Sequence, residues 1–179
     1  MRFCLVDRIL EVHAGKEIRA LKNLTLGEEY LADHFPTFPV MPGVLMLQTL
    51  IEAGAWLLRV TDGFQNSVIV LREARHVKYF TFMEPSRQML ISAELTERDG
   101  NLATFKGKGE VNGNTTVSAR FTVASSNLRD RNPTLRKVDE RLIEHARHLY
   151  TILKGDLVSN GLPPMGVTTR PTTRVAPKG

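Results

Sequence analysis

Three polar side chains in the first third of the chain have types and spacing suited to proton transfer. His34 stands at the start of a loop with three prolines, and Gln48 and Glu52 lie four residues apart in the long apolar segment that follows. Imidazole is well suited to moving a proton near neutral pH, and residues four apart share one face of a helix. This stretch therefore combines a candidate base with a polar pair facing one side.

Each of these residues also has an ordinary structural interpretation. A lone histidine is most often a surface residue, and a polar pair on a helix most often marks a solvent-exposed edge or a subunit interface. The prolines around His34 favour chemistry, because they fix a side chain without a wide hydrogen-bond network. Glu52, among Leu, Met, Ile, Ala and Trp56, needs a raised pKa, a partner or access to a cavity.

The step from Pro42 to Gly43 marks the predicted start of the long helix. A simple helix cap would also explain it. However, glycine lets a ligand approach the backbone closely, and the free N–H groups of a helix start carry partial positive charge. A carbonyl oxygen that develops negative charge there would be stabilised.

The elements that must position these residues form an α+β pattern. Residues 43–60 are apolar nearly all round and predict a buried helix. Asp99-Gly100 and Asn112-Gly113 separate alternating runs, which is typical of hairpins. We expect strands at 3–10, 18–24, 67–71, 75–82, 89–97, 102–111 and 115–124, and a short helix at 28–32. One buried helix followed by an antiparallel meander predicts a curved sheet wrapped on that helix.

The C-terminal part predicts one more helix and then a tail. Asn132-Pro133 offers an N-cap with proline at the first helical position, and Gly155 offers a C-cap. One helical face carries apolar residues, namely Val138, Leu142, Ala146, Leu149, Tyr150 and Leu153. His145 and His148 are too few ligands for a metal site. We expect a main domain at 1–127, a helical extension at 128–155 and a disordered tail at 156–179.

The distribution of charge argues against a nucleic-acid-binding protein. The net charge is +5, but residues 1–127 hold fourteen basic and fourteen acidic side chains, so the excess lies beyond them. Cys4 is the one cysteine, which suits a reducing compartment. The start lacks the pattern of a signal peptide, and the longest apolar stretch, 43–58, is short for a membrane span. We expect a cytoplasmic protein with no cofactor, metal, nucleic-acid or membrane partner.

The stretch HFPTFPVMPGVLMLQ resembles the signature of the (3R)-3-hydroxyacyl-acyl-carrier-protein dehydratases, which reads roughly HFPxxPxMPGVLxxE. The preceding CLVDRILEVHAGKEIRALKNLTLGE resembles the opening of the same family, so the similarity covers residues 3 to about 126. It implies a hot-dog fold, with a curved antiparallel sheet around one long central helix. It also implies an activity of fatty-acid biosynthesis, the loss of water from a 3-hydroxyacyl thioester to give a trans-2-enoyl thioester.

The resemblance assigns roles to particular residues. His34 would take the C2 proton, and the backbone at Pro42, Gly43 and Val44 would bind the thioester carbonyl. The family's proton-donating glutamate falls at Gln48, whereas Glu52 stands where the family commonly has glutamine. In the family the histidine and the acid come from different subunits of a dimer, which often assembles into a hexamer. The substrate would be carried by an acyl-carrier protein or by CoA.

The exchanged pair leaves three functions open. An amide cannot supply a proton, and Glu52 lies ~6 Å further along the helix axis than residue 48, too far for direct replacement. A water chain held by Gln48 and Glu52 would keep the chain a dehydratase. Glu52 could instead activate water as the base of a hot-dog thioesterase. The third alternative is a non-catalytic protein that binds acyl thioesters.

Overall fold

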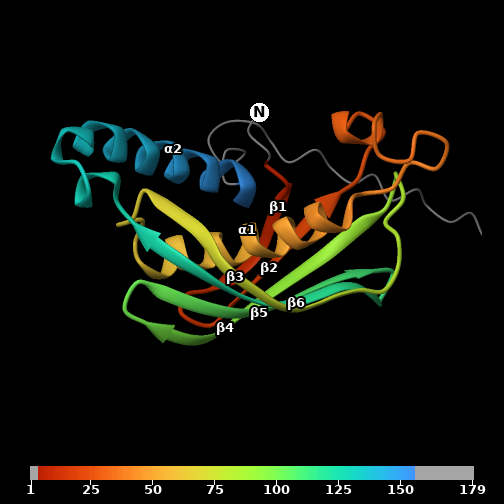
Figure 1. The fold of residues 1–179 in the computed structure, drawn as a ribbon, viewed down its shortest axis with the longest axis horizontal. Coiled ribbons are helices and arrows are strands. Elements are labelled where there is room, and N and C mark those ends of the chain that lie inside the picture. The colour runs from red at the N-terminus through yellow and green to blue at the C-terminus, as the bar shows by residue number, and fades with distance from the viewer. Residues whose placement is uncertain (1–3, 156–179) are drawn as a thin grey trace, which may run out of the picture.

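The computed structural model describes residues 4–155 and shows a hot-dog fold, as predicted. One six-stranded antiparallel sheet, ordered β1-β2-β4-β5-β6-β3, wraps around the long helix α1 (Figure 1). The strands are β1 Arg8–His13, β2 Glu17–Asn23, β3 Val68–Tyr79, β4 Gln88–Asp99, β5 Leu102–Val111 and β6 Asn114–Ser126. The helices are α1 Gly43–Thr61 and α2 Arg136–Lys154, with the short 3₁₀ helices η1 Glu29–Leu31, η2 Leu128–Asp130 and η3 Pro133–Leu135.

The core between α1 and the sheet fixes where the functional residues stand. Leu50 and Leu57 of α1 are fully buried, and Phe105 and Phe121 stack with ring centres 5.4 Å apart beneath the helix. Gly54 lets the helix come close, because a Cβ at this position would lie 2.8 Å from the Phe121 ring. Close packing of this kind leaves the helix no freedom to rotate, so the direction of each side chain on its other face is set.

Both predicted hairpins are confirmed. Asn112 and Gly113 have φ angles of 52° and 79°, so both central residues of the β5–β6 turn lie in the left-handed region. This is the geometry that makes Asn-Gly the preferred pair in two-residue hairpins. Gly100, with φ of 54°, turns β4 into β5.

Two predicted strands, at 67–71 and 75–82, are one strand. β3 runs from Val68 to Tyr79, and its pairing with β6 shifts register between Leu71 and Glu73 and again between Arg75 and Lys78. His76 has φ of 51° within the second irregularity. Such bulges bend a strand without ending it, and they break the alternation that would otherwise have marked a single long strand.

The predicted first strand begins later than expected. Residues 4–7 precede β1 because the amides of Leu5 and Val6 bond to the side chain of Glu52 on α1. The expected short helix at 28–32 is the single 3₁₀ turn η1. The prediction that α1 is buried all round is wrong: Val44 is 69% exposed and Gln48 is also exposed. One side of α1 is therefore open.

The predicted C-terminal helix is present, but it begins later. Asn132 accepts a hydrogen bond from the Thr134 amide and caps η3, and α2 follows from Arg136. The sequence alone did not predict the role of Asp139 in α2. This side chain is fully buried and accepts hydrogen bonds from Ser67 and from the amides of Leu128 and Arg129. Burial acts to raise the pKa of Asp139, but these hydrogen bonds hold it below its usual value. The predicted tail at 156–179 lies outside the described residues.

Among the described residues, α1 alone has the length and apolar character of a membrane span, with a mean hydropathy of 1.3. The same helix forms the centre of the core described above. Its packing against the sheet accounts for its composition, since the core helix of a globular protein meets the same criteria.

Candidate active site

The loop before α1 holds His34 in one orientation and one tautomer. Its Nδ1 lies 2.9 Å from the carbonyl oxygen of Val40, and its own amide donates to the carbonyl oxygen of Tyr30 at 3.1 Å. Because a carbonyl only accepts hydrogen bonds, Nδ1 carries the proton and Nε2 keeps its lone pair. The side chain is half-buried. In this tautomer Nε2 is the ring nitrogen that can accept a proton.

Local backbone strain accompanies this orientation. Phe35, the next residue, has φ of 52°, in the left-handed region that non-glycine residues seldom occupy. Such a conformation costs about 1 kcal/mol and persists where the surroundings impose it. The turn from Phe35 to Phe38 and the bond from the Met41 amide to the Met83 carbonyl impose it here.

The start of α1 faces the same cavity as His34. The amides of Leu45 and Met46 donate to the carbonyl of Pro42, so the amides of Gly43 and Val44 precede the first intrahelical bond. Gly43 and His34 both line a cavity of about 380 Å³, together with Tyr79, Phe80 and Phe82. A Cβ at position 43 would lie 3.1 Å from the Tyr79 ring, so this ring packs directly on the glycine.

Gln48 and Glu52 line a different cavity. Its volume is about 610 Å³, and it lies between the open side of α1, strand β3 and helix α2. Within one chain the structure thus unites His34 with Gly43, and Gln48 with Glu52, but does not bring the two pairs into one cavity. On α1, Val44 follows Gly43 and precedes Gln48, and its side chain is exposed.

Glu52 binds the N-terminal segment of its own chain. Its Oε2 accepts hydrogen bonds from the amide of Leu5 at 2.8 Å and of Val6 at 3.4 Å, and Cys4 Sγ lies 3.5 Å from Oε1. Burial raises the pKa of Glu52, and these hydrogen bonds offset part of the rise. Burial and the neighbouring Glu52 raise the pKa of the Cys4 thiol to about 12, so Cys4 is a weak donor rather than a nucleophile.

This geometry predicts a pH-dependent stability. Because the pKa of Glu52 is raised in the folded protein, the folded state binds this proton more tightly than the unfolded chain does. The contribution of Glu52 is therefore favourable below its ordinary pKa of 4.5 and is lost as the pH rises through the folded value. Urea unfolding should show that the free energy of unfolding of the parent falls between pH 4 and pH 7 by more than that of the Glu52→Gln variant. An equal difference at both values would contradict the assignment.

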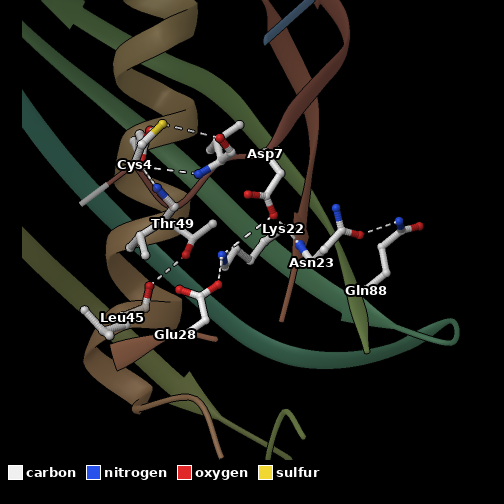
Figure 2. A network of polar contacts seen from close by, with 11 residues as sticks. Cys4, Asp7, Lys22, Asn23, Glu28, Leu45, Thr49 and Gln88 are labelled. Carbon is white, nitrogen blue, oxygen red and sulfur yellow. Dashed lines mark hydrogen bonds and ion pairs between the residues drawn. The ribbon is translucent and has the colours of Figure 1, made fainter. Parts of the chain in front are cut away.

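A buried ion pair anchors the segment that leads to His34. Lys22 is 2% exposed, and its Nζ lies 2.5 Å from Glu28 Oε1 and 3.7 Å from Asp7 Oδ2. Figure 2 shows Lys22 between these two carboxylates, with Cys4 beside α1. Glu28 directly precedes η1, so the pair ties the start of the histidine segment to β2. The signal was available in the sequence, since Lys22 continues the inward-facing alternation of Ile18 and Ala20.

Comparison with known proteins places most of the chain in one family. The sequence model of the FabA-like domain matches residues 1–120. The chain is 36% identical over 129 residues to the 3-hydroxyacyl-[acyl-carrier-protein] dehydratase FabZ of Aromatoleum aromaticum, covering 70% of this chain and 89% of that protein. It is 38% identical over 125 residues to the FabZ of Albidiferax ferrireducens, covering 68% and 83%.

Solved structures support the fold. The dehydratase heterocomplex ApeI:P from Xenorhabdus doucetiae superposes with a TM-score of 0.61 at 14% identity, covering 74% of this chain and 90% of that one. The smu.793 protein from Streptococcus mutans bound to acetyl CoA gives 0.54 at 9% identity, covering 70% and 93%. The family match covers α1, the candidate site and strands β1 to β5, ends within β6, and does not include α2. The chain is a member of the FabA-like domain family.

Proposed function

We propose that the protein is a (3R)-3-hydroxyacyl-[acyl-carrier-protein] dehydratase-like protein of fatty-acid biosynthesis. It would remove water from a 3-hydroxyacyl thioester to give a trans-2-enoyl thioester. The observation that carries this proposal is that His34, whose Nδ1 is held by the Val40 carbonyl, lines one cavity together with Gly43 at the start of α1. The FabZ relatives, matched over most of their length, support the same reaction class.

In this proposal His34 Nε2 takes the C2 proton of the substrate. Negative charge then develops on the thioester carbonyl oxygen, which the amides of Gly43 and Val44 would bind at the helix start. One such donor typically lowers a barrier by ~3–4 kcal/mol. The double bond forms as the C3 hydroxyl leaves, and this group needs a proton to depart as water.

The source of that proton is the weak point of the site. Gln48 can orient a hydroxyl or a water but cannot protonate it. Glu52 has the right chemistry, but its carboxylate already accepts the amides of Leu5 and Val6. Positioned acid catalysis is typically worth ~10²–10⁴-fold. We therefore propose that dehydration by this chain is slow, with water as the proton source.

Two copies of the chain are needed to complete the proposed site, because His34 and Gln48 line separate cavities. β3 is an edge strand that carries exposed Val70 and Leu71, and an uncovered apolar edge favours pairing with a second copy. We propose a homodimer, and a trimer of such dimers as the larger assembly. We also propose the cytoplasm as its location and acyl-carrier protein, or CoA, as the carrier of the substrate.

Light scattering at micromolar concentration should give at least twice the 20.1 kDa mass of one chain. A charged residue on the edge of β3, introduced by Val70→Glu, should shift the protein toward the monomer, because like charges would face each other across the paired edges. A monomeric parent would contradict the two-copy site.

A second function, binding of acyl thioesters without turnover, is favoured by one observation. Neither residue of the polar pair is available as a proton donor, because Gln48 is an amide and the carboxylate of Glu52 already accepts two backbone amides. The thioesterase alternative has less support, since a carboxylate held by two amides is a poor base for water. One assay of crotonyl- and 3-hydroxybutyryl-pantetheine separates the three. Interconversion of the two thioesters indicates a dehydratase, thiol release a thioesterase, and binding without either a carrier of acyl groups.

A further inference from the structure

Helix α2 lies outside the part of the chain that matches the family, yet it is firmly attached. Asp139 in its first turn is bonded to Ser67 before β3 and to the amides of η2. Near its other end, Arg147 donates to the carbonyl of Gly63 at 2.8 Å and lies over the Phe64 ring. These contacts tie both halves of α2 to the segments that flank α1 and β3, so the helix is a fixed wall.

This wall forms one side of the cavity of about 610 Å³ that Gln48 and Glu52 line. In Figure 1, α2 lies on the opposite side of α1 from strands β4, β5 and β6. The part of α2 that faces the cavity is mostly apolar, with Leu142, Ala146 and Leu149, and β3 contributes Ile69 and Val70 opposite. A cavity of this size is in the usual range for small-molecule sites.

The polar residues at the far end of the cavity are already bonded within the chain. Ser67 donates to Asp139, and Arg59 donates to the carbonyl of Asn66 at 3.1 Å. From Gln48 to Arg59 the cavity follows α1 for about 16 Å at 1.5 Å per residue. It therefore offers a long, largely apolar path that begins beside the polar pair.

We propose that the groove between α1 and α2 binds the hydrocarbon part of an acyl thioester, and that Leu142 and Leu149 of α2 select its length. The proposal builds on the function above, because it takes the same thioester as ligand. Each methylene buried in such a groove adds about fourfold to affinity. Long acyl groups should thus bind more tightly than short ones, by contacts that the family domain alone does not supply.

The test uses the full chain and two probes, butyryl- and dodecanoyl-pantetheine, with binding measured by calorimetry. The parent should prefer the dodecanoyl probe. Leu142→Trp fills the groove and should lower the dodecanoyl-to-butyryl affinity ratio by about 15-fold, the loss of roughly two buried methylenes. Leu142→Asn keeps the size but makes the wall polar, and should lower the ratio as well. His148→Trp, on an exposed position of α2, is the matched control and should leave the ratio unchanged.

An unchanged ratio in both Leu142 variants, or a parent without preference for the longer probe, would overturn the proposal. Circular dichroism of each variant establishes that α2 is still folded. The proposed reaction can fail separately from the groove. If the parent binds the dodecanoyl probe through Leu142 but turns over no thioester, the groove proposal is supported and the dehydratase proposal is contradicted. If the parent turns over the butyryl-length substrate but binds both probes equally, the dehydratase proposal is supported and the groove proposal is contradicted.

Discussion

Replacing His34 with alanine should lower the dehydration of 3-hydroxybutyryl-pantetheine by about 10²- to 10⁴-fold, the usual worth of a positioned base. The Val40 carbonyl fixes the proton on Nδ1, which leaves Nε2 as the basic ring nitrogen, and His34 lines one cavity together with Gly43. The variant should fold normally, because the side chain is only half-buried. Initial rates of enoyl thioester formation, with thermal unfolding in parallel, give both quantities.

The control for this variant is His13→Ala. His13 lies on the surface, paired with Glu11 at 3.1 Å, and exposed pairs of this kind contribute little to stability. It should keep the parent rate. If His34→Ala retained activity within twofold of the parent, the base would have to be another group, and the likeness of this loop to the family would not extend to its chemistry.

Local sequence signals predicted most of the fold because they act over short distances. The Asn112-Gly113 turn and the bounds of α1 follow from backbone preferences and apolar periodicity that a few residues determine. The prediction divides β3 in two at the place where its register against β6 shifts, between Leu71 and Glu73, and such a bulge depends on the partner strand. The start of β1 was misplaced for a similar reason, since Glu52 takes the amides that a strand would use.

The site was predictable in its residue types but not in its connections. The proline loop and the Pro42-Gly43 step indicated a base beside a helix start, and the structure places His34 and Gly43 on one cavity. The tautomer of His34 depends on where the Val40 carbonyl lies, which only the folded loop determines. Leu5, a hydrogen-bond partner of Glu52, lies more than forty residues earlier in the chain. Ser67, a partner of Asp139, is likewise more than forty residues before it. Spacing within one helix carries no information about such contacts.

Gln48 and Glu52 differ in their surroundings, and this difference predicts which of the two positions can present a carboxyl group to a ligand. Gln48 is exposed and lines the cavity, whereas Glu52 is half-buried and accepts hydrogen bonds from the amides of Leu5 and Val6. A carboxyl group at position 48 would be free to meet a ligand, whereas the one at position 52 holds the N-terminal segment. The chain thus has a carboxylate that binds the N-terminal segment and, at the position where the resemblance would put the acid, an exposed amide.

Gln48→Glu should therefore raise the rate of dehydration by ~10²-fold or more, because it places a proton donor at the exposed position. Glu52 lies one turn away, and two carboxyls on one helical face raise the pKa of at least one of them. A raised pKa keeps the new group protonated closer to neutral pH, as a general acid requires. Rates with 3-hydroxybutyryl-pantetheine across pH 5 to 9 should show a new acidic group in the pH profile of the variant.

Two further variants distinguish the roles of the pair. Gln48→Met removes the amide without adding an acid, so it should bring no gain. Glu52→Gln should change turnover little, because Glu52 holds the N-terminal segment and a glutamine oxygen can still accept the hydrogen bond from the Leu5 amide. The opposite pattern, with turnover abolished by Glu52→Gln and not improved by Gln48→Glu, would make Glu52 the working carboxylate, acting through water. If neither the parent nor Gln48→Glu turns over while both bind the acyl probe, the site lacks more than its acid, and binding is what the chain retains.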